Sequence, residues 1–224
     1  MKKFVRLAAF VLIGFWMACQ TYAAAQETKR AAAELSESQK QILKNIETYF
    51  NSLKTMKSRF VQRSGKGAEV EGTIYIQKPG KMRLIYDPPY EVDIYATGYY
   101  LIFHDRKLGQ VTHLDIDATP ATIILKENFS FDSSGLTVTD VRTLPGAVEI
   151  SLFKTKEPAA GSITMRFSEK PVVLKQWTVA DAQRVNTAVS LVNPEFGVKI
   201  DPSLLQFVDP RKNIRPGDPT RKRR

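Results

Sequence analysis

The chain has 224 residues, of which 43% are hydrophobic and 25% are charged, which is enough apolar material for one domain with a sizeable core. Its 33 Lys and Arg residues against 23 Asp and Glu residues give a formal net charge of +10. Seven of the basic residues lie from Arg211 onward, so the charge between residues 26 and 210 is nearly balanced. This distribution argues against a basic binding face, and we expect no nucleic-acid partner.

Residues 1–25 have the pattern of a cleaved secretory signal peptide. A cationic stretch at residues 2–6 precedes an uncharged apolar run of about a dozen residues, which is too short to cross a bilayer. Ala23 and Ala25 form the small-residue pattern of a cleavage site, so we expect the mature chain to begin at Gln26. A retained N-terminal anchor is the alternative interpretation. Export would place the protein in the periplasm.

Cys19 is the only cysteine, and it lies inside this N-terminal segment. We therefore expect a mature chain with no cysteine, which would exclude disulfides and thiol chemistry. The alternative is that Cys19 is the acylated residue of a lipoprotein. Trp16 stands where such signals usually carry leucine, which argues against that alternative.

Residues 34–58 predict an amphipathic helix, because their apolar side chains recur at intervals of three and four. Ser36 or Ser38 is a suitable N-cap. The opposite face of the helix carries Lys44, Glu47, Asn51 and Lys54.

After residue 58 the hydrophobic period changes to two, which is typical of strands. Residues 73–78 and 82–86 predict a hairpin, because Pro79-Gly80-Lys81 between them is suited to a turn. Simple pairing puts Ile74, Ile76, Lys78, Met82, Leu84 and Tyr86 on one face, and Tyr75, Arg83 and Ile85 on the other. Further strands are predicted at 92–96, 99–104, 109–114, 136–142, 147–153, 162–167, 172–179 and 186–192. Their short connections favour an antiparallel meander.

A short central helix is predicted to start with Thr119 as its N-cap and Pro120 at its first position. The resulting fold class is α+β, with a large curved antiparallel sheet, an incomplete β-barrel, whose helices form a lid over an apolar space. The alternative is that side chains fill this space as an ordinary core.

Several motifs occur in an informative order along the chain. They are Phe60-Val61-Gln62, Gly72 before a strand, the run from Lys78 to Pro89, a strand led by Gly98, and Gln110-Val111-Thr112. Together with the export signal, the absent cysteines and the Thr119-Pro120 helix, they resemble the LolA family of periplasmic outer-membrane lipoprotein carriers. The resemblance extends over residues 37–210. With the signal peptide (1–25) and the basic tail (211–224), which we expect to be disordered, this leaves one carrier domain at residues 26–210.

The resemblance implies a monomeric carrier that catalyses no reaction and needs no cofactor. Such a carrier takes lipoproteins from an inner-membrane ABC transporter complex and delivers them to the outer membrane, commonly through a receptor lipoprotein. Its apolar cavity would hold the acyl chains. The residues expected to contact them are Phe50, Met56, Phe60, Ile74, Ile76, Met82, Leu84, Ile94, Leu101 and Ile124.

Lys78 stands before a proline, where the family usually has an arginine that holds the lid over the empty cavity. Lysine lacks the rigid two-pronged donor geometry of arginine, so we expect a weaker latch or one shared with Arg83. An ordinary charge at the end of a hairpin is the alternative for Lys78. Met82 matches a position at the cavity mouth, with core packing as its alternative.

Other chemistry finds little support in the sequence. His104 is followed directly by Asp105, and adjacent residues cannot orient an imidazole as a catalytic triad does. His113, Asp115 and Asp117 alternate along one segment, but no fourth metal ligand is evident. No glycine-rich nucleotide motif occurs. We therefore predict neither catalytic nor metal-binding residues.

Two other functions remain open alongside lipoprotein carriage. The chain could bind or sense another lipid, or it could be an interaction module with a filled core. The basic tail could contact anionic lipid head groups or simply keep the protein in solution.

Overall fold

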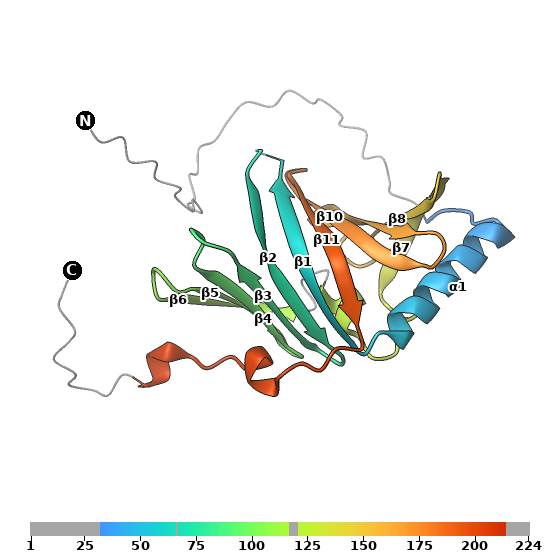
Figure 1. Ribbon diagram of the computed structural model, residues 1–224. Coiled ribbons are helices and arrows are strands. Elements are labelled where there is room, and N and C mark those ends of the chain that lie inside the picture. Colours follow the sequence, from blue (N-terminus) through green and yellow to red (C-terminus); the bar gives the residue numbers. More distant parts are fainter. Residues whose placement is uncertain (1–31, 66, 117–120, 214–224) are drawn as a thin grey trace, which may run out of the picture.

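The computed structural model describes residues 32–65, 67–116 and 121–213 (Figure 1). The helices are α1 (Glu37–Ser52) and α2 (Ala121–Leu125), with short 3-10 helices η2 (Pro158–Ala160), η3 (Pro202–Leu205) and η4 (Pro210–Asn213). The strands are β1 (Thr55–Ser64), β2 (Glu69–Gln77), β3 (Lys81–Tyr86), β4 (Val92–Thr97), β5 (Tyr100–Asp105), β6 (Gln110–Asp115), β7 (Leu136–Leu144), β8 (Ala147–Lys154), β9 (Gly161–Ser168), β10 (Val173–Asp181) and β11 (Asn186–Phe196).

All eleven strands form one sheet in the order β6-β5-β4-β3-β2-β1-β11-β10-β9-β8-β7, and every neighbouring pair is antiparallel. The sheet is curved, and β6 and β7 are its two edges (Figure 1). The prediction of one large antiparallel sheet that does not close on itself is confirmed. Because β6 and β7 are consecutive in sequence, the chain between them connects opposite edges, and α2 lies in this connection.

The predicted helix over residues 34–58 is wrong at its C-terminal end. Helix α1 stops at Ser52, and Leu53 has an extended backbone at φ −67° and ψ 116°. Strand β1 begins at Thr55, where no strand was predicted. The error arises at Met56, because this residue continues the spacing of the helix and also begins the alternation of the strand. The predicted start of the central helix at Thr119 and Pro120 lies outside the described residues.

Helix α1 begins with a capping box. The Ser36 side chain accepts from the Gln39 backbone N–H, and the Gln39 side chain accepts from the Ser36 backbone N–H. One face of the helix buries Leu43, Ile46 and Phe50. Figure 1 shows the helix on the side of the sheet that holds β7 to β11.

The strand register shows which residues point to the inner face of the sheet, the face that packs against the helices. Residues that are paired across antiparallel strands point to the same side. One row of such pairs runs through Met56, Ile76, Met82, Ala96, Leu101 and Leu114, and the next runs through Ser58, Ile74, Leu84, Ile94, Phe103 and Thr112. The predicted faces of the first hairpin are confirmed, because Ile74 pairs with Leu84 and Ile76 with Met82.

Gly72 has a packing role in the middle of β2. It pairs with Phe60 on β1, and the Phe60 ring covers it. A Cβ atom built on Gly72 would lie 2.2 Å from the Ile85 carbonyl oxygen and 2.6 Å from two ring atoms of Phe60. The missing side chain therefore lets Phe60 lie flat on the inner face, where its ring meets the Tyr86 ring edge-on at 5.2 Å.

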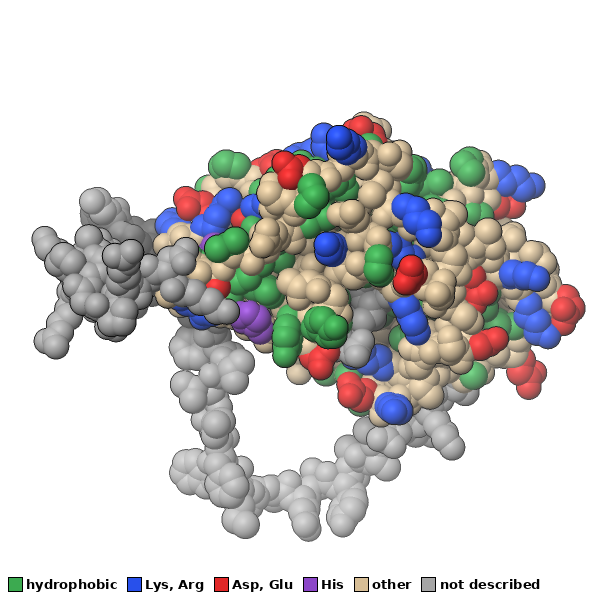
Figure 2. Space-filling model, turned by 90° about the horizontal axis from the view of Figure 1, so that it is seen from below, with side chains coloured by type: hydrophobic (Ala, Val, Ile, Leu, Met, Phe, Trp, Pro, Cys, Tyr) green, Lys and Arg blue, Asp and Glu red, His purple; other side chains and the backbone are tan. Residues whose placement is uncertain are grey.

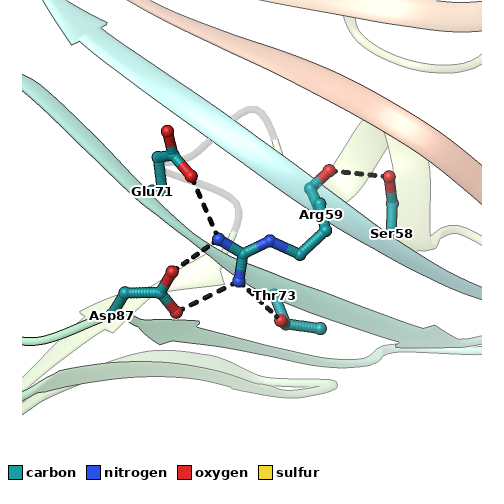
Figure 3. A network of polar contacts seen from close by, with 5 residues as sticks. All are labelled: Ser58, Arg59, Glu71, Thr73 and Asp87. Atoms are coloured by element: carbon teal, nitrogen blue, oxygen red, sulfur yellow. Dashed lines mark hydrogen bonds and ion pairs between the residues drawn. The ribbon is translucent and has the colours of Figure 1, made fainter.

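On the outer face, an ion-pair network joins β1, β2 and the residue that follows β3 (Figure 3). Arg59 donates to both carboxylate oxygens of Asp87, and it also reaches Glu71 and the Thr73 hydroxyl. The bidentate pair fixes the Arg59 guanidinium. Its hydrogen bonds raise the pKa of Arg59 and lower the pKa of Asp87. The network points away from the inner face, so it leaves that face apolar.

Replacing Gly72 with alanine should destabilise the protein by about 3 kcal/mol, because the new methyl group overlaps backbone as well as the Phe60 ring. Gly109→Ala is the control. Gly109 has a positive φ of 64° with nothing near its Cβ position, so only backbone strain of about 1 kcal/mol is expected. Urea unfolding measures both, and equal losses would contradict the packing role of Gly72.

Candidate functional site

The ten residues predicted to contact lipid all lie in or against one apolar cluster. Eight are buried and two, Ile94 and Leu101, are half-buried. The buried ones are Phe50, Met56, Phe60, Ile74, Ile76, Met82, Leu84 and Ile124. The structure brings them together from α1, α2 and five strands, β1 to β5. Their contact with lipid stays a prediction.

The inner face becomes exposed to solvent toward the β6 edge. Ile74 on β2 is 0% exposed, whereas Phe103 on β5 is 41% exposed and Leu114 on β6 is 47% exposed. Phe103 belongs to the same row of paired residues as Ile74, and Leu114 belongs to the row of Met82. The apolar surface is therefore continuous from the covered core to a strip that is open to solvent.

Two polar side chains of α1 hold the segment that follows α2. Asn51 donates to the Phe129 carbonyl at 2.9 Å and accepts from the Phe129 N–H at 2.8 Å. Glu47 accepts from the Phe131 N–H at 2.7 Å. The Phe129 ring packs edge-on against Phe50 at 5.5 Å, so this segment and α1 form one cover over the inner face.

The helical pattern placed Glu47 and Asn51 opposite the apolar face and did not predict this contact. Their spacing of four places them on one side of the helix, next to the apolar stripe. A position beside the apolar stripe indicates that both side chains could contact a neighbouring segment. The sequence could not identify that segment, because the partner groups are backbone atoms far away in sequence.

Lys78 ties the first hairpin to α1. Its ammonium group donates to the Phe50 carbonyl at 2.6 Å, and its backbone N–H donates to the Lys54 carbonyl at 2.8 Å. Two residues later, the Gly80 N–H donates to the Leu125 carbonyl at the end of α2 at 3.0 Å. The hairpin turn thus contacts both helices that cover the inner face.

Burial lowers the pKa of Lys78 from 10.5 to about 8. The positive charge of Lys54 acts in the same direction, while Glu127 opposes it. The hydrogen bond to Phe50 is therefore made by an amine that is poorly solvated and close to losing its charge.

Arg83 does not share this contact, so its expected role in a lid latch needs correction. It points to the outer face, where it donates to Asp93 at 3.0 Å and to the Leu204 carbonyl at 3.2 Å. Its guanidinium carbon also lies 4.7 Å from the centre of the Tyr95 ring. The physical reason is strand alternation, because Arg83 lies between Met82 and Leu84, which both point inward. It anchors the C-terminal segment that Figure 1 shows beneath β3 to β5.

Both histidines lie on the same outer face. The rings of His104 and His113 are 5.8 Å and 6.3 Å from the ring of Phe207 in the C-terminal segment. Asp117, which alternates with His113 and Asp115 in the candidate metal-binding pattern, lies outside the described residues. Within the described ranges, no three His, Cys, Asp or Glu side chains gather as metal ligands, and no helix is long and apolar enough to cross a membrane.

Cavities open beside the cover. One of about 480 Å³ lies next to α2, between the turns at Gly80 and Gly98 and the start of β7. Another, of about 320 Å³, lies at the end of α1 near Leu53 and Phe196. Figure 2 shows that hydrophobic side chains reach one face of the molecule among interspersed acidic and basic ones. The larger volume lies in the range of about 300–1,000 Å³ that is usual for small-molecule sites.

The lowered pKa of Lys78 predicts a pH effect on stability. Between pH 8 and about 10, the unfolded chain binds more protons at this residue than the folded chain does, so the free energy of unfolding should rise with pH. Lys78→Met should lack this rise, and so should Lys78→Arg, which stays charged throughout. Urea unfolding at several pH values tests this. Parallel curves for all three proteins would contradict the assigned environment.

The family described as "Outer membrane lipoprotein carrier protein LolA" matches residues 51–208. An outer-membrane lipoprotein carrier protein of Methylococcus capsulatus is 27% identical over 179 residues, which cover 74% of this chain and 82% of that protein. A protein of the same name from Nitrosomonas europaea is 28% identical over 177 residues, with 75% and 85% covered.

Among solved structures, a LolA superfamily protein from Nitrosomonas europaea is similar with a TM-score of 0.45 and 8% sequence identity, covering 75% of this chain and 97% of that one. The family match extends over β1 to β11 and over the Lys78 hairpin. LolA-family carriers are periplasmic proteins and not enzymes. This chain belongs to the LolA family of outer-membrane lipoprotein carrier proteins.

Proposed function

We propose that this chain takes lipoproteins from an inner-membrane ABC transporter complex and delivers them to the outer membrane, with their acyl chains held on the inner face of the sheet. The proposal includes a signal peptide at residues 1–25, a carrier domain at 26–210 and a basic tail at 211–224. The carrier works in the periplasm as a monomer. A receptor lipoprotein in the outer membrane is a further partner under this proposal.

The free energy of hydration explains why such a carrier is needed. An acyl chain exposed to water costs about 0.8 kcal/mol for each CH₂ group, so a lipoprotein with several chains does not cross an aqueous compartment unaided. An apolar surface that replaces the membrane removes this cost. The carrier must also release its cargo, which requires a surface that can repack.

The observation that carries the proposal is the continuous apolar inner face. It runs from residues sealed under the helices, such as Ile76, to the uncovered side chains of Phe103 and Leu114. An acyl chain that meets the open strip first can extend inward only if the cover moves. Met56 and Met82 lie along that route, and their flexible side chains can adapt to a new neighbour.

The cover is held by apolar packing against the inner face and by a small number of polar contacts. Asn51, Glu47 and Lys78 each bond to backbone groups, and each such bond contributes about 1 kcal/mol net. Burial of acyl CH₂ groups on the inner face can offset their loss. This balance favours a closed empty carrier and an open loaded one.

Leu101→Glu tests the acyl-binding face. Leu101 is half-buried on the inner side of β5, so a carboxylate there should abolish binding of acyl chains while the fold survives. Tyr75→Glu is the matched control, because Tyr75 is half-buried on the outer side of β2. Thermal unfolding should confirm that both variants are folded.

The assay is release of a lipoprotein from spheroplasts, with native mass spectrometry of the released complex. We expect the wild-type protein and Tyr75→Glu to release cargo and to carry it with its acyl chains. Leu101→Glu should release less than about a tenth as much, since a buried charge costs well over 1.4 kcal/mol. Equal release by Leu101→Glu would show that the inner face does not hold the chains.

A further inference from the structure

The cavity of about 480 Å³ beside α2 combines an apolar floor with a cationic rim. Its apolar lining comes from Ile116, Leu125 and Leu136. Ile116 and Leu125 belong to the main core, and Leu136 packs against it, so the floor is continuous with the apolar interior. Backbone of Gly80, Gly98 and Gly135 completes the wall without adding side-chain bulk.

Three lysines line the same cavity: Lys126 after α2, Lys154 at the end of β8, and Lys156 in the following turn. In the part of the chain that the structure describes, none of them lies within ion-pair distance of a carboxylate. Glu157 is the one acidic residue among the described residues that line the cavity. Among the described residues, the rim therefore carries an excess of positive charge that no carboxylate pairs with.

We propose that this cavity binds an amphiphile with an anionic head group, a carboxylate or a phosphate, and a single apolar chain. The head group would accept hydrogen bonds from Lys126, Lys154 and Lys156, and charged pairs of this kind are stronger than neutral ones. The chain would lie on Ile116, Leu125 and Leu136. An acyl chain in ester or amide linkage has no charge of its own, so lipoprotein carriage alone does not call for the three lysines. The ligand is a free fatty acid or an anionic lysophospholipid.

The test measures binding of four probes to the full chain by isothermal titration calorimetry, below the concentration at which the lipids aggregate. The probes are oleate, 1-oleoyl lysophosphatidylglycerol, 1-oleoyl lysophosphatidylcholine and an acidic hexapeptide without an acyl chain. The first two separate a carboxylate from a phosphate source. The third has the same chain with a zwitterionic head, and the fourth carries negative charge alone.

We expect at least one of the two anionic lipids to bind about tenfold more tightly than lysophosphatidylcholine. The combined variant Lys126→Gln, Lys154→Gln and Lys156→Gln should lose that preference and retain binding of the zwitterionic lipid. The matched control replaces Lys57, Lys81 and Lys107 with glutamine, because these exposed lysines lie outside the cavity and the change in net charge is the same. The control should keep the preference.

Three results would overturn the proposal: equal binding of anionic and zwitterionic lipids, loss of the preference in the control as well, or binding of the hexapeptide as tightly as the anionic lipids. The lipoprotein-release assay keeps the two proposals separate. The lysine-to-glutamine cavity variant should still release lipoprotein from spheroplasts, whereas Leu101→Glu should not. A cavity variant that loses both activities would instead assign the lysines to lipoprotein carriage.

Discussion

The connection between β6 and β7 is the constraint on which the rest of the structure depends. These strands are consecutive in sequence but form opposite edges of the sheet, so the chain between them has to pass from one edge to the other. In doing so it brings α2 and the segment with Phe129 and Phe131 to the apolar inner face. The topology of an open meander thus supplies its own cover, and α1 completes it.

The cover is sealed by packing but held in place by a small number of polar contacts. Asn51 and Glu47 bond to the backbone of the segment after α2, and Lys78 bonds to the backbone of α1. Backbone partners do not depend on the identity of the side chain at those positions. The same apolar surface that stabilises the empty protein is the surface that an acyl chain would occupy, so stability and function compete for it.

Much of this fold could be predicted from the sequence, because the alternation of apolar residues fixes both strand position and face. Ile74, Ile76, Met82 and Leu84 share the inner face as expected. Two kinds of feature could not be predicted: the end of α1 and the side-chain contacts with distant segments. Met56 fits a helical and an extended period equally well, and only the extended backbone at Leu53 decides between them. Asn51 bonds to the Phe129 backbone, and Arg83 bonds to the Leu204 carbonyl as well as to Asp93. No local pattern encodes the two contacts with distant backbone groups.

Hydrogen–deuterium exchange at the Phe129 and Phe131 amides tests most directly whether the cover moves when cargo binds. Both amides donate to side chains of α1 in the empty protein. Addition of a synthetic triacylated lipopeptide should speed their exchange by about tenfold or more, while the amides of β1 and β2 stay protected. Unchanged exchange at both amides with the lipopeptide bound would contradict the account, because the acyl chains would then have entered without displacing the cover.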